Sequence, residues 1–233
     1  MGAPGGYSGN RRSGIGMTSD RTRTRMIERL RGEGIRDEVV LAAMNGVPRH
    51  IFVDEALAIR AYDDVPLPIG SGQTISQPWI VARMSELARN GRALDAVLEI
   101  GTGCGYQTAV LAQLAATVYT VERIGALVAK ARRNLQSLKV KNVRLKHGDG
   151  GADLGETLAV DAIIVTAGAT HVPTGLLKHL KPGGRLVLPL AQAQAEGEAR
   201  GVQRLTVIDL GAAGMREQVL DTVRFVPLLP GLA

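Results

Sequence analysis

The residues that most directly suggest chemistry are three glycines at alternate positions, Gly101, Gly103 and Gly105. An apolar segment over 96–100 predicts a strand before them, and a helix is expected from Tyr106, so the glycines form a strand-to-helix turn. Glycine lets the main chain turn sharply and lets a ligand approach it closely. The spacing lacks the third glycine of a dinucleotide-binding fingerprint, and no Gly-Lys-Ser/Thr of a phosphate-binding loop is present.

This glycine pattern, read from Glu99 to Gly105, resembles the first motif of class I S-adenosylmethionine-dependent methyltransferases. Two acidic residues at later strand ends fit the same cofactor. Glu122 ends the second strand, where a carboxylate can accept both ribose hydroxyls. Asp149 follows the third strand, where it could accept a hydrogen bond from the adenine amino group. Since parallel strands end at one edge of a sheet, we expect these residues to form one cofactor site.

Several methyl acceptors are disfavoured by motifs that the sequence lacks. Enzymes that methylate amino groups of adenine or cytosine carry an Asn/Asp-Pro-Pro-aromatic motif after the fourth strand, but this position reads Thr166-Ala-Gly-Ala-Thr170. Cytosine C5 enzymes need a Pro-Cys nucleophile, whereas Cys104 lies in the glycine loop. Neither a cluster of oxygen ligands nor a set of histidines has metal-ligand spacing, so we expect no metal.

A long segment over 48–78, rich in proline and glycine, precedes the sheet and ends in Gln73-Thr-Ile-Ser76-Gln-Pro78. Together with the motifs above, this loop resembles the protein-L-isoaspartate O-methyltransferase family, over roughly residues 20 to 230. Further matching segments are Arg49-His-Ile-Phe-Val53, Val121-Glu-Arg123, His147-Gly-Asp-Gly150, Pro182-Gly-Gly184 and Val223-Arg-Phe-Val-Pro-Leu228. The chain departs from the family at Trp79, usually a smaller aromatic, and at Cys104, commonly serine.

The resemblance implies transfer of a methyl group from S-adenosylmethionine to the free α-carboxylate of isoaspartyl residues, which starts repair of damaged proteins through a succinimide and leaves S-adenosylhomocysteine. It implies that Ser76 is the active-site residue. The motifs themselves predict cofactor contacts from Glu99, Gly101, Gly103, Gly105, Glu122 and Asp149. The resemblance implies further contacts from Gln73, Thr74, Ile75, Arg123 and Gly150.

The role of Ser76 follows from the chemistry of the acceptor. An α-carboxylate ordinarily titrates with a pKa of about 3.5, so it is ionised at neutral pH and needs no general base. We therefore expect Ser76 to orient the carboxylate by hydrogen bonds. A serine just before Pro78 is also the residue type that caps a helix beginning there, and the sequence leaves both roles open.

Two other functions remain compatible with the sequence. One is methylation of a different carboxyl group or small molecule on the same scaffold. The other is a non-catalytic module that only binds S-adenosylmethionine. The glycine loop and the Ser76 loop are both intact, which argues against the non-catalytic module. Turnover of an isoaspartyl peptide would separate the two enzymatic functions.

The elements that must position these residues alternate between strands and helices. We predict an α/β fold with an open, doubly wound, mostly parallel seven-stranded sheet and an antiparallel pair of strands at its C-terminal end. The strands are expected at 96–100, 117–122, 142–148, 160–167, 185–190, 203–210 and 218–228. One methyltransferase domain would span 18–233, with N-terminal helices and the substrate loop over 18–90 and the cofactor-binding core over 91–233.

Composition and charge place limits on location and partners. The 233 residues are 45% hydrophobic and 21% charged, and no apolar run approaches the roughly 20 residues that span a bilayer. With one cysteine and no secretory signal, we expect a cytoplasmic protein. We also expect a monomer. Most of the net charge of +6 lies in residues 1–31, and 1–17 read as a disordered basic leader. We expect isoaspartyl proteins and peptides as partners, with no specific nucleic acid and no membrane.

Overall fold

The computed structural model describes residues 16–152, 154–155, 157–192, 202–211 and 214–233. The predicted leader therefore lies almost wholly outside the described residues, and only its end is seen, where Gly16–Thr18 form a 3-10 turn (η1). No helix in the described part has both the length and the apolar character needed to cross a membrane.

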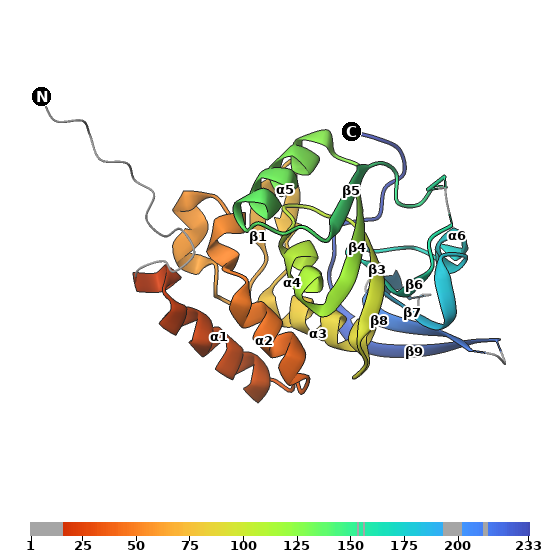
Figure 1. Cartoon of the computed structure of the whole chain (residues 1–233), viewed down its shortest axis with the longest axis horizontal. Helices are drawn as coiled ribbons and strands as arrows, with labels where there is room; N and C mark the ends of the chain where they lie inside the picture. Colours follow the sequence, from red (N-terminus) through yellow and green to blue (C-terminus); the bar gives the residue numbers. More distant parts are fainter. Residues whose placement is uncertain (1–15, 153, 156, 193–201, 212–213) are drawn as a thin grey trace, which may run out of the picture.

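A seven-stranded sheet forms the centre of the described structure (Figure 1). Its spatial order is β5-β4-β3-β6-β7-β8-β9. The strands are β3 (Leu94–Ile100), β4 (Ala115–Glu122), β5 (Val143–His147), β6 (Val160–Val165), β7 (Leu180–Ala191), β8 (Gln203–Gly211) and β9 (Gly214–Val223). Strands β3 to β7 pair in parallel, and β8 and β9 pair antiparallel. This arrangement confirms the predicted fold class.

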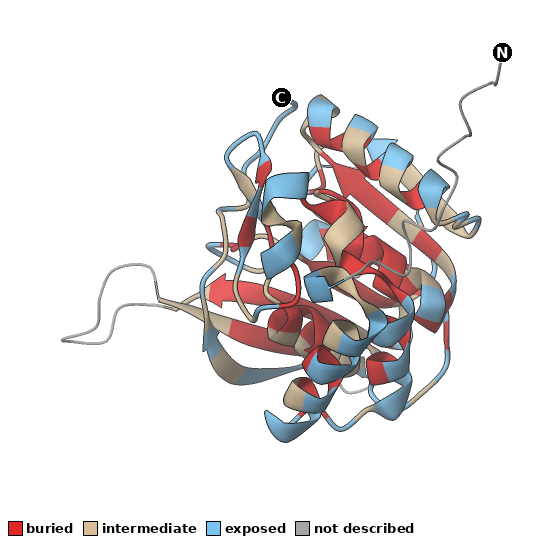
Figure 2. Ribbon diagram, turned by 90° about the vertical axis from the view of Figure 1, so that its left-hand side faces the viewer, coloured by how far each residue is buried: buried red, intermediate tan, exposed pale blue. Residues whose placement is uncertain are grey.

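Helices pack on both faces of the sheet, as a doubly wound fold requires. Helices α3 (Pro78–Arg89) and α4 (Tyr106–Leu114) contribute Met84 and Leu111 to a core with Ile164 on one face. Helix α5 (Gly125–Ser137) packs against β4 and β5. The short helix α6 (Thr174–Leu177) lies on the other face of the sheet, where Leu176 is buried in the core. Buried positions accordingly run through the strands and along the inner sides of the helices (Figure 2).

Two N-terminal helices add a layer outside α3 and α4 (Figure 1). Helix α1 (Asp20–Gly32) begins at Ser19, whose side chain accepts a hydrogen bond from the Thr22 amide. Helix α2 (Glu38–Gly46) begins at Asp37, whose side chain accepts from the amides of Val39 and Val40. Such caps satisfy amides that would otherwise lack a partner at a helix start. The apolar faces are buried, with Met26, Ile27 and Leu30 on α1 and Val40, Leu41 and Met44 on α2.

The segment 48–78 is more regular than its prolines and glycines suggested. It forms two 3-10 helices, η2 (Arg49–Phe52) and η3 (Glu55–Arg60), and then an antiparallel hairpin of β1 (Leu67–Gly70) and β2 (Gln73–Ile75). The hairpin turns through Gly70, Ser71 and Gly72, which all have positive φ. Side chains alternate between buried and exposed along β1, and this two-residue period was masked by its neighbouring prolines.

Two strands differ from the prediction by more than two residues. Strand β7 begins at Leu180 rather than 185, because an irregularity in its pairing with β6 takes the Pro-Gly-Gly sequence into the strand. Strand β9 covers Gly214–Val223 rather than 218–228, because its antiparallel pairing with β8 already begins at Gly214, which pairs with Gly211. The chain after Val223 leaves β9 and runs beside Gly168 at the end of β6.

Candidate active site

The glycine loop joins β3 to α4 at the carboxyl edge of the sheet. Gly101 has φ +96°, and a methyl group on it would collide with the Thr166 hydroxyl at the end of β6. Gly105 has φ +90° at the start of α4, where a methyl group would lie 3.4 Å from the Ala131 side chain of α5. Positive φ therefore favours glycine at both positions, and at Gly101 the clash with Thr166 excludes a side chain as well, which leaves main chain exposed there.

The carboxylate of Glu122 holds this loop in shape from the end of β4. One oxygen accepts a hydrogen bond from the Gly103 amide at 2.8 Å, and the other accepts from the Ile124 amide at 2.9 Å. Glu122 is only 5% exposed. Each carboxylate oxygen can accept more than one hydrogen bond, so both retain capacity for hydroxyl donors of a ligand.

Two adjoining pockets open at this edge. The larger, called the edge pocket here, is lined by Ile69, Gln73, Thr74, Ile100, Gly101, Gly103, Val121, Glu122, Arg123, Ile124, Leu127, Gly150, Thr166, Ala167, Val226, Pro227, Leu228 and Leu229. The smaller, called the serine pocket, is lined by Ile69, Thr74, Ile75, Ser76, Val81, Gly101, Thr102, Gly103, Cys104, Tyr106, Gln107 and Thr166. The two share a wall that includes Thr74, Gly101 and Thr166. Two ligands, one in each pocket, would therefore meet at this wall.

Most of the residues predicted for the site line these pockets. The edge pocket includes Gln73, Thr74, Gly101, Gly103, Glu122, Arg123 and Gly150, and the serine pocket includes Ile75 and Ser76. Within the described residues, three of those predicted for the cofactor line neither pocket: Glu99, Gly105 and Asp149. Their direct contacts with a cofactor stay predictions, and their positions indicate structural roles.

Glu99 lies beneath the glycine loop, fully buried at the end of β3. Its carboxyl group accepts hydrogen bonds from the hydroxyls of Thr108 on α4 at 2.5 Å and Thr120 on β4 at 2.6 Å. Burial raises the pKa of Glu99 to about 8, although the two threonine hydroxyls act in the opposite direction. At neutral pH the group is mainly a neutral acid that joins β3, β4 and α4.

Asp149 connects the end of β5 to the C-terminal segment. Its side chain accepts hydrogen bonds from the amides of Gly231 at 2.6 Å and Gly151 at 2.8 Å. These amides, with Gly231 contributing most, lower the pKa of Asp149. The next residue, Gly150, lines the edge pocket against Ile100, whose side chain would collide with a methyl group there.

The structure corrects one of the two roles left open for Ser76. The N-cap of α3 is Gln77, whose own side chain makes no capping hydrogen bond, and Pro78 occupies the first turn. Asp64, from the loop before β1, accepts the Trp79 amide at 2.7 Å and the Gln77 side-chain amide at 3.0 Å. Because Asp64 supplies the cap, the half-buried Ser76 faces the serine pocket without being needed to start the helix.

Sequence reasoning gave no role to one part of the site, the segment Val226–Leu229. It forms a wall of the edge pocket and is held beside β6 by hydrogen bonds from the Gly168 amide to the Val226 carbonyl and from the Leu228 amide to the Gly168 carbonyl. The segment was part of the family resemblance, but it was expected in a strand. That expectation hid its position at the edge.

The edge pocket has the features that S-adenosylmethionine would need. Exposed main chain at Gly101 and Gly103 permits close approach, and the Glu122 carboxylate can accept ribose hydroxyls. Apolar side chains of Ile100, Val121 and Leu127 could cover an adenosine group. In the described part of the chain, no three histidine, cysteine or acidic side chains gather as metal ligands would.

Comparison with known proteins gives a consistent result. The profile of the protein-L-isoaspartate(D-aspartate) O-methyltransferase family matches residues 21–232. A protein-L-isoaspartate O-methyltransferase of Nitrosomonas eutropha is 57% identical over 223 residues, covering 95% of this chain and 97% of that protein. One from Dechloromonas aromatica is 58% identical, covering 94% and 98%. A putative enzyme of this kind from Plasmodium falciparum, crystallised with S-adenosyl-L-homocysteine, is 26% identical with a TM-score of 0.73 and covers 89% of this chain and 98% of its own.

Proposed function

The chain belongs to the protein-L-isoaspartate(D-aspartate) O-methyltransferase family, as its sequence motifs indicated, and on this premise we propose the reaction that it carries out. It transfers the methyl group of S-adenosylmethionine to the free α-carboxylate of isoaspartyl residues in damaged proteins and peptides. The methyl ester then cyclises to a succinimide, whose hydrolysis returns part of the residue to normal aspartate. We propose damaged proteins and peptides with isoaspartyl residues as its substrates and the cytoplasm as its location.

The observation that carries this proposal is the wall shared by the two pockets. The edge pocket offers Glu122 and the glycine main chain to a nucleoside, and the serine pocket offers the Ser76 hydroxyl to an acceptor. A donor and an acceptor so placed meet beside Thr74 and Thr166. Alignment of this kind can supply roughly 7–11 kcal/mol of rate acceleration.

The titratable side chains of the serine pocket suit an acceptor that is already ionised. Burial raises the pKa of Cys104 to about 11 and the pKa of Tyr106 to about 12. Both groups therefore stay neutral at pH 7 and are poor candidates for a general base. A carboxylate needs no base, whereas an alcohol acceptor would, so the pocket favours the carboxyl substrate over an alcohol.

The protein's own residues bind, orient and exclude water in this reaction. S-adenosylmethionine, when bound, supplies an electrophilic methyl group on a sulfonium. We assign its binding to Gln73, Thr74, Gly101, Gly103, Glu122, Arg123 and Gly150, all of which line the edge pocket. Ser76 donates a hydrogen bond to the acceptor carboxylate and aligns it. Opposite charges neutralise each other as the bond forms, so a pocket with little water favours the step.

The test uses labelled S-adenosylmethionine and two peptides that differ only in carrying isoaspartate or aspartate at one position. We expect base-labile methanol to be released only after incubation with the isoaspartyl peptide. Equal release from both peptides would indicate a general carboxyl methyltransferase. Cofactor binding without transfer to either peptide would contradict the proposed substrate.

A further inference from the structure

One buried charged residue near the serine pocket has no ion-pair partner among the described residues. Arg49, in η2, is completely buried. Its Nε donates a hydrogen bond to the Ala61 carbonyl at 2.7 Å, but Nη1 and Nη2 find no acceptor among the described residues. Ion pairs recorded in the described part of the chain do not include Arg49 either.

This arrangement is unfavourable for the free protein. Burial lowers the pKa of Arg49, but a guanidinium begins so high that it keeps its proton at neutral pH. A buried charge without a partner is among the most destabilising features of a core. Arg185 shows the ordinary solution, since its guanidinium makes two hydrogen bonds to Asp209 at 2.6 and 2.9 Å and one to the Leu87 carbonyl.

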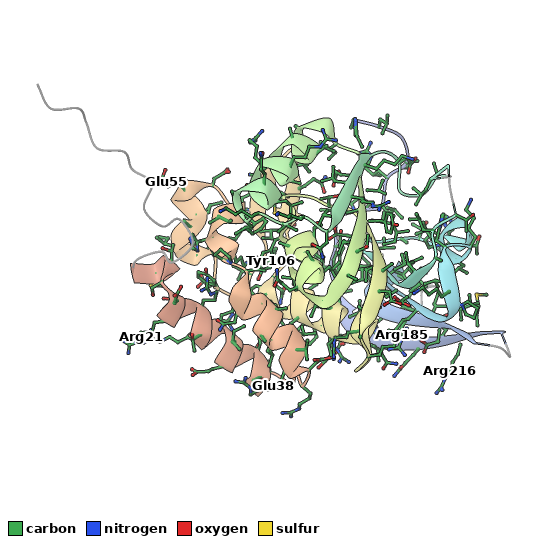
Figure 3. The ribbon with its side chains drawn as sticks, in the orientation of Figure 1. Arg21, Glu38, Glu55, Tyr106, Arg185 and Arg216 are labelled. Atoms are coloured by element: carbon green, nitrogen blue, oxygen red, sulfur yellow. The ribbon has the colours of Figure 1, made fainter. Side chains whose placement is uncertain are left out.

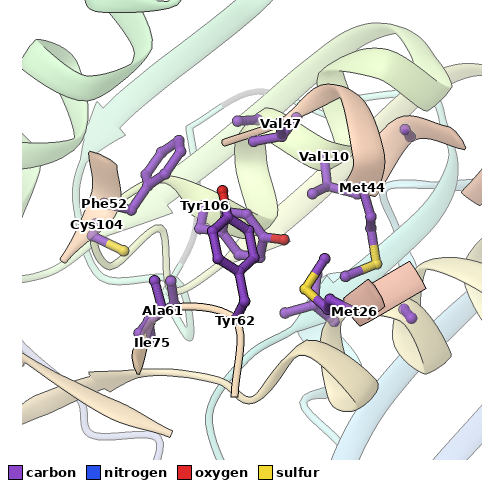
Figure 4. Close-up of a cluster of buried hydrophobic side chains, with 14 of the residues drawn as sticks. Met26, Met44, Val47, Phe52, Ala61, Tyr62, Ile75, Cys104, Tyr106 and Val110 are labelled. Carbon is purple, nitrogen blue, oxygen red and sulfur yellow. The ribbon is translucent and has the colours of Figure 1, made fainter. Parts of the chain in front are cut away.

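The unpaired charge of Arg49 lies behind the wall of the serine pocket. Its guanidinium carbon is 4.7 Å from the centre of the Tyr106 ring, and Tyr106 lines that pocket together with Ser76. Figure 4 shows Tyr106 in the buried cluster that also contains Tyr62, Phe52 and Cys104, and the centre of the Phe52 ring lies 5.3 Å from that of Tyr106. The carboxylate of Asp64 also feels this charge, but it is already engaged with Gln77 and Trp79.

We propose that Arg49 is a positioning residue whose uncompensated charge attracts the isoaspartyl carboxylate into the serine pocket. This inference rests on the proposed function, and it explains why the serine pocket would prefer an acceptor with a negative charge. The charge acts through the Tyr106 wall, without direct contact. Methylation converts the carboxylate to a neutral ester, so the attraction is lost in the product, which favours its release.

The proposal predicts a particular division of kinetic effects. Arg49 stabilises the bound anion more than the transition state, in which the negative charge has already begun to disappear. Removing the charge should therefore raise KM for the isoaspartyl peptide and leave kcat unchanged or slightly higher. Because the two charges are separated by the Tyr106 ring and interact at an effective dielectric of about 20, we expect KM to rise by roughly tenfold to thirtyfold.

The experiment compares Arg49→Met, Arg49→Gln and Arg49→Lys with the wild type. Each is assayed for KM and kcat with the isoaspartyl peptide, for the Ki of the same peptide with a neutral α-amide, and for stability in urea. Arg49→Gln can keep the hydrogen bond to Ala61 and serves if Arg49→Met does not fold. Arg185→Met is the matched control, since Arg185 is paired and lies well apart from Tyr106 (Figure 3).

We expect the neutral variants to raise KM for the acid, to leave Ki for the amide unchanged and to resist urea at least as well as the wild type. Arg49→Lys should keep most of the preference for the acid, and Arg185→Met should lose stability without altering KM. An equal loss of acid and amide binding, or an unchanged KM, would overturn the proposal. Absence of wild-type turnover would instead count against the proposed function, and the urea comparison would still report whether the charge is unpaired.

Discussion

The edge pocket and the serine pocket share a wall, yet they are built in different ways. The edge pocket depends on main chain: positive φ at Gly101 and Gly103, and amides held by the Glu122 carboxylate. The serine pocket depends on side chains from the β1–β2 hairpin, the loop before α3, and α4, among them Ser76 and Tyr106. The first construction suits a ligand that never changes, and the second can be adjusted to an acceptor residue by residue.

Buried ionisable groups repeat the same contrast. Glu99, under the glycine loop, is neutral and joins three elements through two threonine hydroxyls. Arg49, behind the serine pocket, keeps its positive charge although two of its nitrogens have no hydrogen-bond acceptor among the described residues. The neutral group thus links structural elements under the edge pocket. The charged group behind the serine pocket lowers the stability of the fold but provides a positive electrostatic potential there.

The largest effect should come from breaking the main chain of the edge pocket. In Gly101→Ala the added methyl group collides with the Thr166 hydroxyl, and alanine is strained at this positive φ. Together the two effects should destabilise this conformation of the loop by roughly 3 kcal/mol or more. We expect cofactor affinity, measured by calorimetry, to fall by about a hundredfold or more. Gly183→Ala is the control, because Gly183 also has positive φ but nothing lies within 4 Å of the added atom. Equal affinity in the two variants would contradict a pocket built from main chain.

A smaller effect is expected from the side chain of the serine pocket. Ser76→Ala removes one hydrogen bond to a charged group, an interaction of about 1.5–3 kcal/mol, so kcat/KM for the isoaspartyl peptide should fall by roughly tenfold to a hundredfold. Cofactor affinity should stay at the wild-type value. Ser71→Ala, on the exposed turn between β1 and β2, should change neither quantity. A wild-type rate in Ser76→Ala would remove Ser76 from the mechanism.

Glu99 should give the fold a dependence on pH that sharpens the contrast between the buried groups. Its pKa is about 8 in the folded state against 4.5 without burial, so its contribution to stability is fully present below pH 4.5 and is lost as pH rises toward 8. Within that window the free energy of unfolding should fall by at most about 1.4 kcal/mol per pH unit. Glu99→Gln imitates the neutral acid and should flatten this slope in urea titrations. Parallel curves for the two proteins would show that Glu99 is not neutral at pH 7.

The smallest effect concerns the cap that frees Ser76 from a structural role. Asp64→Ala should lower stability by about 1 kcal/mol, the usual value of an N-cap, and should raise KM for the peptide a few-fold because Gln77 and Trp79 flank the Ser76 loop. Asp63→Ala, which removes an exposed partner of Arg60, should do neither. If Asp64→Ala changed only stability, the cap and the pocket would be independent.

The fold and the edge pocket were predictable because their requirements are local. Glycine at a strand-to-helix turn and acids at strand ends are fixed by main-chain geometry, so the position of Gly101 and Glu122 could be read from spacing alone. The alternation of strands and helices likewise predicted the sheet and its antiparallel end.

The serine pocket was less predictable because its parts come together only through long-range packing. The cap role proposed for Ser76 was wrong, since it belongs to Asp64 across the hairpin. The edge pocket has one such part as well, because the segment after Val223 was assigned to a strand, whereas it leaves β9 and Val226–Leu229 line that pocket. No periodicity reports that a buried arginine lacks a partner, and this became visible only with the contacts of Arg49.

The position of Val226–Leu229 has a consequence for synthesis of the protein. Ile69 and Leu229 line the same pocket, although nearly the whole sheet lies between them in the chain. On the ribosome, strands β3 to β7 can emerge and pair before this wall of the cofactor pocket exists. Tight binding of S-adenosylmethionine therefore has to await the last segment, and it would stabilise only chains that have been translated and folded through that point.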